Sequence, residues 1–189
     1  EKLINKINAC GKTFLLICRP LEMTTWSSLI SFLENSEILP SKIVTNVGFV
    51  DFTPKKKETL ALSIDHVNAV LGAKIATAKF AEYGHTSEGI KPLYNTQYKQ
   101  KYLSNVELVC KTNDVVVINT PKVHQNFSGI RQRPLSFFSG ILKANEFNRS
   151  ISGAKIIEVP EFDNKLTYDA VHFTSEGNEL IFDLVKEAL

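Results

Sequence analysis

Short, continuous apolar runs that alternate with helical stretches constrain this chain more than any other feature. Four of these runs are predicted to be strands: Thr13–Cys18, Lys42–Val50, Val115–Ile118 and Ala154–Val159. They are mostly apolar along their length and do not alternate with polar residues, so each strand is expected to be buried on both faces. Such burial requires helices on both sides of a mainly parallel sheet. The sequence therefore predicts an α/β fold, a three-layer α/β/α sandwich.

Apolar residues at helical spacing fill the gaps between the predicted strands. One helix is predicted to open at Thr24–Trp26, and a second covers residues 60–71. A third lies between the third and fourth strands. Between the second and third strands the pattern is less regular, with a predicted loop at Gly84–Gly89 and a further helix over residues 97–111.

The composition is typical of an ordinary soluble globular protein. A chain of 189 residues is long enough for one core, so we expect a single domain spanning residues 1–189. A net charge of +2 gives no electrostatic case for binding nucleic acid. No apolar run reaches the roughly 18 residues of a membrane span. The first residue is Glu1 instead of Met, which is typical of a chain trimmed at its N-terminus.

The three cysteines are Cys10, Cys18 and Cys110, an odd number that cannot all pair. Their spacing resembles neither a disulfide framework nor a metal site, so we expect no metal and no cofactor. This cysteine usage favours a reducing compartment, and the cytoplasm is the expected location.

A short Asp-x-x-His motif, Asp169 to His172, comes directly before the C-terminal amphipathic helix. Thr174 is a suitable N-cap for that helix, because its hydroxyl can accept from free backbone N–H groups. The buried stripe of the helix is predicted to contain Leu180, Ile181, Leu184, Val185 and Ala188. Two polar residues in a surface loop are the simpler interpretation. The alternative is a catalytic pair in which the carboxylate orients an imidazole base.

Polar residues follow each predicted strand, at the edge where open parallel sheets form their sites. Arg19 follows the first strand, Asn46 and Asp51 lie around the end of the second, and His124 follows the third. The Asp-x-x-His loop comes after the fourth. If the sheet is parallel, these side chains belong to one edge and are candidates for contact with a ligand. Asp51 is equally suited to capping a helix.

The late Asp169-x-x-His172 pair, followed by Phe-Thr-x-x-Gly and a terminal helix, resembles the last block of the SGNH (GDSL-type) hydrolases. The strand that contains residues 43–51 resembles their Gly-x-Asn-Asp block. The resemblance implies a flavodoxin-like sandwich that hydrolyses esters, thioesters or acyl sugars, or transfers acyl groups. It also implies a serine nucleophile, a histidine base, an orienting aspartate, and an oxyanion site built from a glycine N–H and an asparagine side chain.

Carried over residue by residue, the resemblance is partial. His172 matches the base, Asp169 the orienting carboxylate and Gly48 the glycine of the oxyanion site. The asparagine of that site would fall at Val50, which has no side-chain donor. Asn46 lies nearby, but it stands earlier on the predicted strand, which is a displaced position.

The larger departure from the family is the nucleophile, because no serine stands at the end of the first predicted strand. Cys18 occupies that place and would give Cys–His–Asp chemistry, with Arg19 favouring the thiolate. A buried structural cysteine is the competing interpretation. A hydroxyl within Thr24–Ser28 is a second candidate, although capping of the helix explains it equally well. Alternatively, Thr13–Cys18 is the second strand of the family's sheet and the first lies upstream.

The function expected from these patterns is an SGNH-like acyl esterase or acyltransferase. Its substrate would be a small-molecule or glycan acyl ester, with carbohydrate suggested only by the breadth of the family. The alternative is a catalytically inactive SGNH-like domain for binding or assembly. In that case the ligand contacts would be Arg19, Asn46, Asp51, His124 and His172, with Trp26 as a stacking surface. A flavodoxin-like nucleotide binder is disfavoured, because no glycine-rich phosphate loop follows the first strand.

Overall fold

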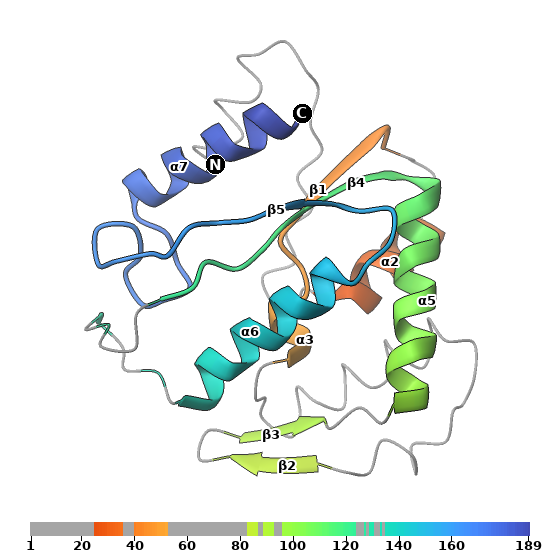
Figure 1. Cartoon of the computed structure of the whole chain (residues 1–189), viewed down its shortest axis with the longest axis horizontal. Coiled ribbons are helices and arrows are strands. Elements are labelled where there is room, and N and C mark those ends of the chain that lie inside the picture. The colour runs from red at the N-terminus through yellow and green to blue at the C-terminus, as the bar shows by residue number, and fades with distance from the viewer. Residues whose placement is uncertain are drawn as a thin grey trace.

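A computed structural model of the chain describes residues 25–35, 40–52, 83–86, 89–92, 96–123, 127, 129–130, 133 and 135–189. The described helices are α2 (Trp26–Asn35), α3 (Phe49–Phe52), α5 (Thr96–Thr112), α6 (Leu135–Arg149) and α7 (Ser175–Ala188). The described strands are β1 (Lys42–Thr45), β2 (Tyr83–Thr86), β3 (Gly89–Pro92), β4 (Asp114–Ile118) and β5 (Lys155–Ile157) (Figure 1).

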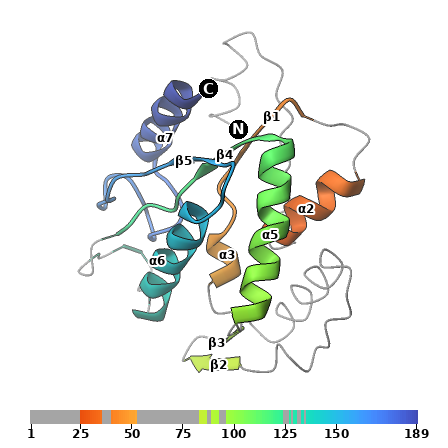
Figure 2. The ribbon, with the colours of Figure 1, turned by 45° about the vertical axis from the view of Figure 1, so that its right-hand side comes forward.

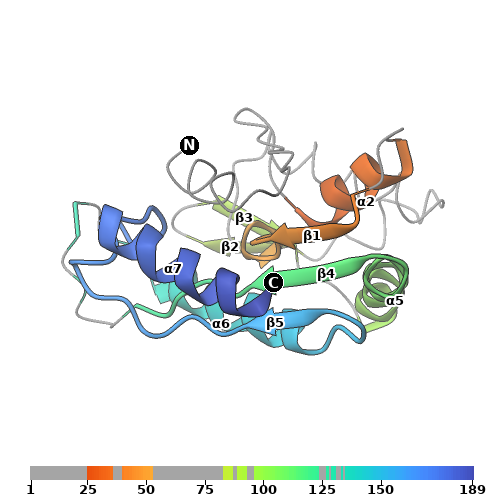
Figure 3. The same ribbon diagram turned by 90° about the horizontal axis from the view of Figure 1, so that it is seen from above.

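Within the described residues, β1, β4 and β5 form a parallel sheet in that order, with β4 in the middle (Figure 3). The register aligns Val44 with Val116 and Val117 with Ile156. The predicted α/β class and parallel sheet are therefore confirmed for this part of the chain. The predicted strand Thr13–Cys18 and the predicted helix over residues 60–71 lie outside the described residues.

Helices pack on both faces of this sheet, as the apolar central strand requires. Val115 and Val117 of β4 belong to one buried cluster, together with residues of α2, α5 and α6. Val116 and Ile118 point the other way and join a second cluster with α7. Figure 2 shows α7 on one side of the strands and α5 and α2 on the other. The period-2 geometry of a strand thus divides β4 between two cores.

The direction of α7 places its first turn at the carboxyl edge of the sheet. Its last turn lies at the opposite edge, where the Lys155 Nζ atom donates to the Ala188 carbonyl at 2.7 Å. The Lys42 Nζ atom donates to the Leu189 carbonyl at 3.5 Å. Both lysines open their strands, β5 and β1. Because α7 runs antiparallel to the strands, the loop that precedes it lies near their carboxyl ends.

The prediction of a strand over Lys42–Val50 is wrong in its second half. The strand ends at Thr45, whose hydroxyl accepts the Val47 N–H at 3.3 Å. Gly48 then adopts a φ of +112°, a conformation that L side chains rarely adopt. Its carbonyl accepts the Asp51 N–H at 3.1 Å and starts the short helix α3.

The prediction of a loop over Gly84–Gly89 is wrong at both ends, because Gly84–Thr86 and Gly89 belong to strands. Gly84 pairs with Lys91 and Thr86 pairs with Gly89 in the antiparallel β2–β3 ladder. Glycine is typical of loops, but here the two segments pair through their backbones, and each is too short to show a strand period in the sequence. The helix predicted over residues 97–111 is confirmed as α5. None of the described helices combines the length and apolar character needed to cross a membrane.

Candidate functional site

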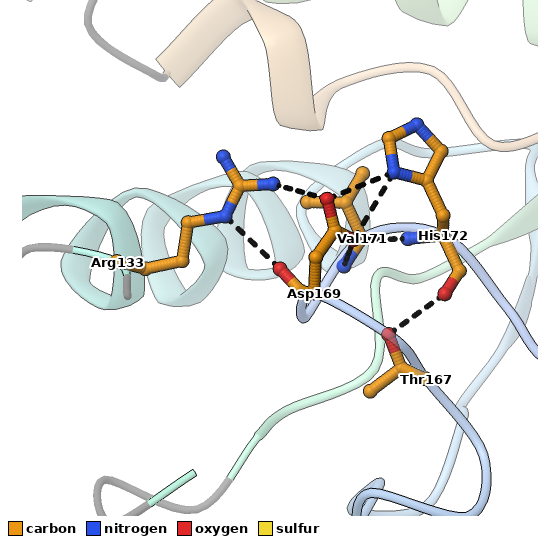
Figure 4. A network of polar contacts seen from close by, with 5 residues as sticks. All are labelled: Arg133, Thr167, Asp169, Val171 and His172. Atoms are coloured by element: carbon orange, nitrogen blue, oxygen red, sulfur yellow. Dashed lines mark hydrogen bonds and ion pairs between the residues drawn. The ribbon is translucent and has the colours of Figure 1, made fainter. Parts of the chain in front are cut away.

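The loop over residues 169–172 lies between β5 and α7 and is closed by its own backbone (Figure 4). The His172 carbonyl accepts the Tyr168 N–H at 3.0 Å and the Thr167 hydroxyl at 2.9 Å. An antiparallel bridge joins Thr167 to Phe173 directly outside these bonds. The two ends of the loop are therefore fixed side by side, so the loop is a tight turn with defined geometry.

Thr174 connects this turn to α7, and its predicted role as N-cap is confirmed. Its hydroxyl accepts the Gly177 N–H at 3.1 Å and donates to the Lys165 carbonyl. At Gly177 an added Cβ would lie 2.1 Å from the Leu166 carbonyl oxygen. The Phe-Thr-x-x-Gly pattern thus has a physical basis: threonine caps the helix, and glycine leaves room for the carbonyl of the turn at Leu166.

Asp169 and His172 are in direct contact. The ring Nδ1 of His172 lies 3.1 Å from Oδ1 and 3.0 Å from Oδ2 of Asp169. An ionised carboxylate can only accept, so Nδ1 is the donor in this contact. In a neutral ring with this tautomer, Nε2 has the free lone pair. The Asp169 side chain is 10% exposed, whereas that of His172 is 75% exposed. A buried carboxylate therefore orients an imidazole whose other nitrogen faces solvent, the arrangement of a base and its orienting group.

The Asp169 carboxylate is held in its charged form. Burial raises its pKa, but hydrogen bonds from the His172 N–H, the His172 ring and the Val171 N–H outweigh burial and lower it to about 2. The two backbone donors lie 2.9 and 3.1 Å from Oδ1. The loop backbone thus folds around its own carboxylate.

Arg133 is a member of the site that sequence reasoning missed. Its Nη2 donates to Asp169 Oδ2 at 2.7 Å and its Nε donates to the Asp169 carbonyl at 3.0 Å (Figure 4). It precedes α6 and is 36 residues from Asp169 in sequence. No local pattern marks it, because only the folded chain brings the two segments together.

Ala170 has a φ of 69°, which is unusual for a residue with a side chain. Its methyl group is fully buried. The left-handed residue reverses the chain between Asp169 and His172, so that backbone N–H groups and the ring reach one carboxylate. Strained backbone of this kind is common at functional sites.

Asp169→Asn is expected to destabilise the protein by about 2 kcal/mol at neutral pH, from the difference between a pKa of about 2 and the ordinary 3.8. Since the folded pKa is the lower one, the carboxylate stabilises the fold fully above about pH 4. This contribution is lost as the pH falls towards about 2. Urea unfolding at several pH values should therefore show the gap between wild type and variant closing below about pH 4.

Asp183→Asn serves as the matched control, because Asp183 is an exposed carboxylate on α7. It should change the free energy of unfolding by no more than about 0.5 kcal/mol at any of these pH values. A gap for Asp169→Asn that stays constant down to about pH 2 would contradict the charged role of Asp169.

One apolar cluster links the Asp-x-x-His loop to the start of α3. We call it the loop cluster; it contains Val123, Phe137, Ile141 and Ala170, with Phe49, Phe127, Phe138 and Val171 against it. Within it the rings of Phe49 and Phe137 meet edge to face, 5.3 Å apart. Phe49 directly follows Gly48. The predicted oxyanion glycine is thus only one residue from a side chain packed in the same cluster as the loop.

Gly48 lies against the buried side chain of Asn148, which sequence reasoning also missed. A Cβ at Gly48 would lie 2.7 Å from Asn148 Oδ1. That oxygen accepts the Trp26 Nε1–H at 3.1 Å, while Asn148 Nδ2 donates to Asn119 Oδ1 at 3.1 Å and to the Val47 carbonyl at 3.4 Å. Asparagines from α6 and from the end of β4 therefore fix the turn after β1.

The other predicted site residues are distributed differently. Asn46 is exposed at the end of β1. Asp51 is buried, and its Oδ2 accepts the Trp26 backbone N–H at 3.3 Å, so it caps α2. Trp26 is fully buried in the core, so its suggested role as a stacking surface is wrong.

Among the described residues, the structure places no nucleophile beside His172. Cys18, Arg19 and His124 lie outside the described residues. Within the described part, no hydroxyl or thiol is hydrogen-bonded to the His172 ring, and no group of His, Cys, Asp and Glu side chains could hold a metal ion. Cys110 is buried in α5, and burial followed by the nearby Glu107 charge raises its pKa to about 11, which makes it a poor nucleophile.

Comparison of the chain with protein-family models, with curated proteins and with solved structures found no match. The site is therefore defined by its own geometry: a solvent-facing imidazole, a buried carboxylate and an arginine behind it.

Proposed function

We propose that the chain is an SGNH-like acyl esterase or acyltransferase in which His172 is the general base and Asp169 its orienting group. The observation that carries this proposal is the contact of Nδ1 with both oxygens of a buried, ionised carboxylate. This contact leaves Nε2 of an exposed ring as the proton acceptor. Such a pair suits the removal of a proton from a nucleophile attacking an ester carbonyl.

The topology supports the same proposal. A flavodoxin-like SGNH sheet has the order 2-1-3-4-5, and β1, β4 and β5 fit its third, fourth and fifth strands. Under this assignment α7 is the terminal helix, and the loop before it lies at the carboxyl edge, where sites form in parallel sheets.

In the proposed mechanism the Cys18 thiol gives its proton to Nε2 of His172 and its sulfur attacks the acyl carbonyl. The imidazolium returns this proton to the departing alcohol, and a thioester remains on the sulfur. Water, or an acceptor alcohol, then attacks the thioester while Nε2 takes its proton. The acyl product leaves, and the imidazolium returns this proton to the released Cys18 sulfur. The negative charge of Asp169 stabilises the imidazolium in both steps. The N–H of Gly48 is the proposed oxyanion donor.

The second candidate is a binding or assembly domain that no longer performs chemistry. It is favoured by one observation, namely that no described hydroxyl or thiol is bonded to the His172 ring. In this alternative the exposed imidazole would contact a ligand. Acylated carbohydrate is the narrower proposal for the substrate of the enzyme and for the ligand of the binding domain.

Hydrolysis of p-nitrophenyl acetate separates the two candidates. His172→Ala is expected to lower kcat/KM at least about 100-fold, the usual contribution of a positioned base. His85→Ala, which removes a histidine from the separate β2–β3 hairpin, controls for the general reactivity of imidazoles towards this ester. If the two variants are equally active, His172 is not a catalytic base.

A pair of cysteine variants tests the nucleophile in the same assay. Cys18→Ala should abolish the burst of p-nitrophenol, whereas Cys110→Ala removes a buried thiol and should retain it. Activity that depends on His172 but not on Cys18 would support His172 as the base and contradict Cys18 as the nucleophile. Wild type without measurable turnover of this ester or of acetylated sugars would favour the binding domain.

A further inference from the structure

The guanidinium of Arg133 is held in one position beside the carboxylate. Two hydrogen bonds join it to Asp169, one to the side chain and one to the main chain. Its side chain is about 10% exposed, and its Cζ lies 4.8 Å from the centre of the Phe137 ring. Since Phe137 belongs to the loop cluster, the positive charge is fixed by the same packing that supports the loop.

Arg133 and His172 share one carboxylate oxygen. Oδ2 of Asp169 lies 2.7 Å from Nη2 of Arg133 and 3.0 Å from Nδ1 of His172. The guanidinium and the ring are thus separated by no more than two hydrogen bonds that meet at one atom. A proton added to the ring places a second positive charge close to the first, and like charges this close in a partly desolvated site oppose each other.

We propose that Arg133 is a positioning residue that keeps His172 neutral, and so able to accept a proton, at a lower pH than Asp169 alone would allow. A carboxylate by itself favours the protonated ring. A carboxylate whose charge is shared with a fixed arginine favours it less, while still orienting Nδ1. This inference deepens the proposed function and rests on it.

The described elements that pack around the loop contribute apolar side chains to the loop cluster, so the charges at Asp169 come from Arg133 and His172. Among the described residues, Arg133 and His172 are the charged or titratable side chains bonded to Asp169. From α3 the loop cluster receives the apolar Phe49, while Asp51 of that helix accepts from the Trp26 backbone. From α6 it receives apolar side chains.

Arg133→Gln is expected to move the midpoint of the acidic limb of the kcat/KM–pH profile upward by about one pH unit, because the repulsion that opposes ring protonation is removed. The matched control is Arg149→Gln. Arg149 pairs with Glu158 through Nε at 2.7 Å and Nη2 at 2.9 Å. Its replacement by glutamine should leave the midpoint of the kcat/KM–pH profile unchanged. A folded Arg133→Gln variant with the wild-type midpoint would overturn the inference.

Arg133→Lys separates charge from position. Lysine keeps the positive charge but lacks the planar fork that contacts two oxygens at once. The midpoint should stay within about 0.3 pH units of wild type while kcat/KM falls, because the carboxylate is held less rigidly. A midpoint that moves as far as in Arg133→Gln would show that charge is not the cause.

Nuclear magnetic resonance of the free protein keeps this test separate from the proposed activity. The Cε1–H signal of the His172 ring should titrate about one pH unit higher in Arg133→Gln than in wild type, whether or not the protein hydrolyses esters. If the glutamine variant does not fold, wild type alone suffices. The Arg133 Nε–H resonance should then shift with the same midpoint as the His172 ring, and a resonance that stays constant across that range would overturn the inference.

Discussion

Gly177→Ala is expected to destabilise the folded protein by about 3 kcal/mol, although alanine ordinarily stabilises a helix by about 1 kcal/mol over glycine. The new Cβ would lie 2.1 Å from the Leu166 carbonyl oxygen and 3.2 Å from the Phe173 Cβ. The carbonyl cannot retreat freely, because it accepts the Thr174 N–H at 3.1 Å. Either α7 or the turn before it must shift, and urea unfolding would measure the loss.

Ser175→Ala provides the control in the same helical turn. Ser175 is exposed at the first position of α7, so its replacement should change stability by less than about 0.5 kcal/mol. A Gly177→Ala protein as stable as wild type would mean that the segment before α7 can move at no cost. In that case the loop that carries the imidazole would not be rigid.

Asn148→Leu is expected to destabilise the protein by about 4 kcal/mol, because it removes the bond to the Val47 carbonyl and, above all, takes the Asn148 partner from two buried side-chain groups, each loss costing about 1–3 kcal/mol. These groups are the Trp26 Nε1–H and the Asn119 Oδ1, which now bond to the Asn148 side chain at 3.1 Å. All three side chains are essentially fully buried, so water cannot readily replace the lost bonds.

A double-mutant cycle with Trp26→Phe isolates one of these bonds. Phenylalanine removes the indole donor, so Asn148→Leu should cost about 1–2 kcal/mol less in that background. Strict additivity of the two changes in unfolding free energy would show that the Trp26–Asn148 bond does not contribute. The bond matters for the site because Asn148 also fixes the turn at Gly48.

Local patterns in the sequence predicted the parts of the fold that local physics determines. The apolar run at 115–118 became β4, buried on both faces. Thr174 became the cap of α7, whose predicted stripe faces the second core cluster. In each case a few neighbouring residues suffice, since periodicity and capping operate within one or two turns of chain.

What could not be predicted depends on contacts between distant segments. The strand from Lys42 was expected to continue to Val50, but Gly48 turns the chain against Asn148, 100 residues later. Asp51 was a candidate ligand contact, yet it caps a helix that precedes it in the chain. Arg133 gave no signal at all. Its role exists only because α6 and the Asp-x-x-His loop meet.

The contacts around Asp169 also determine the charge balance of the site. With the imidazole neutral, Arg133 and Asp169 compensate each other, so this part of the site carries no net charge. When the ring accepts a proton, the same three groups carry a net charge of +1. A site of this kind would neither attract nor repel an uncharged ester at rest. It would become cationic only as a negatively charged intermediate forms, when a positive charge stabilises the reacting group most.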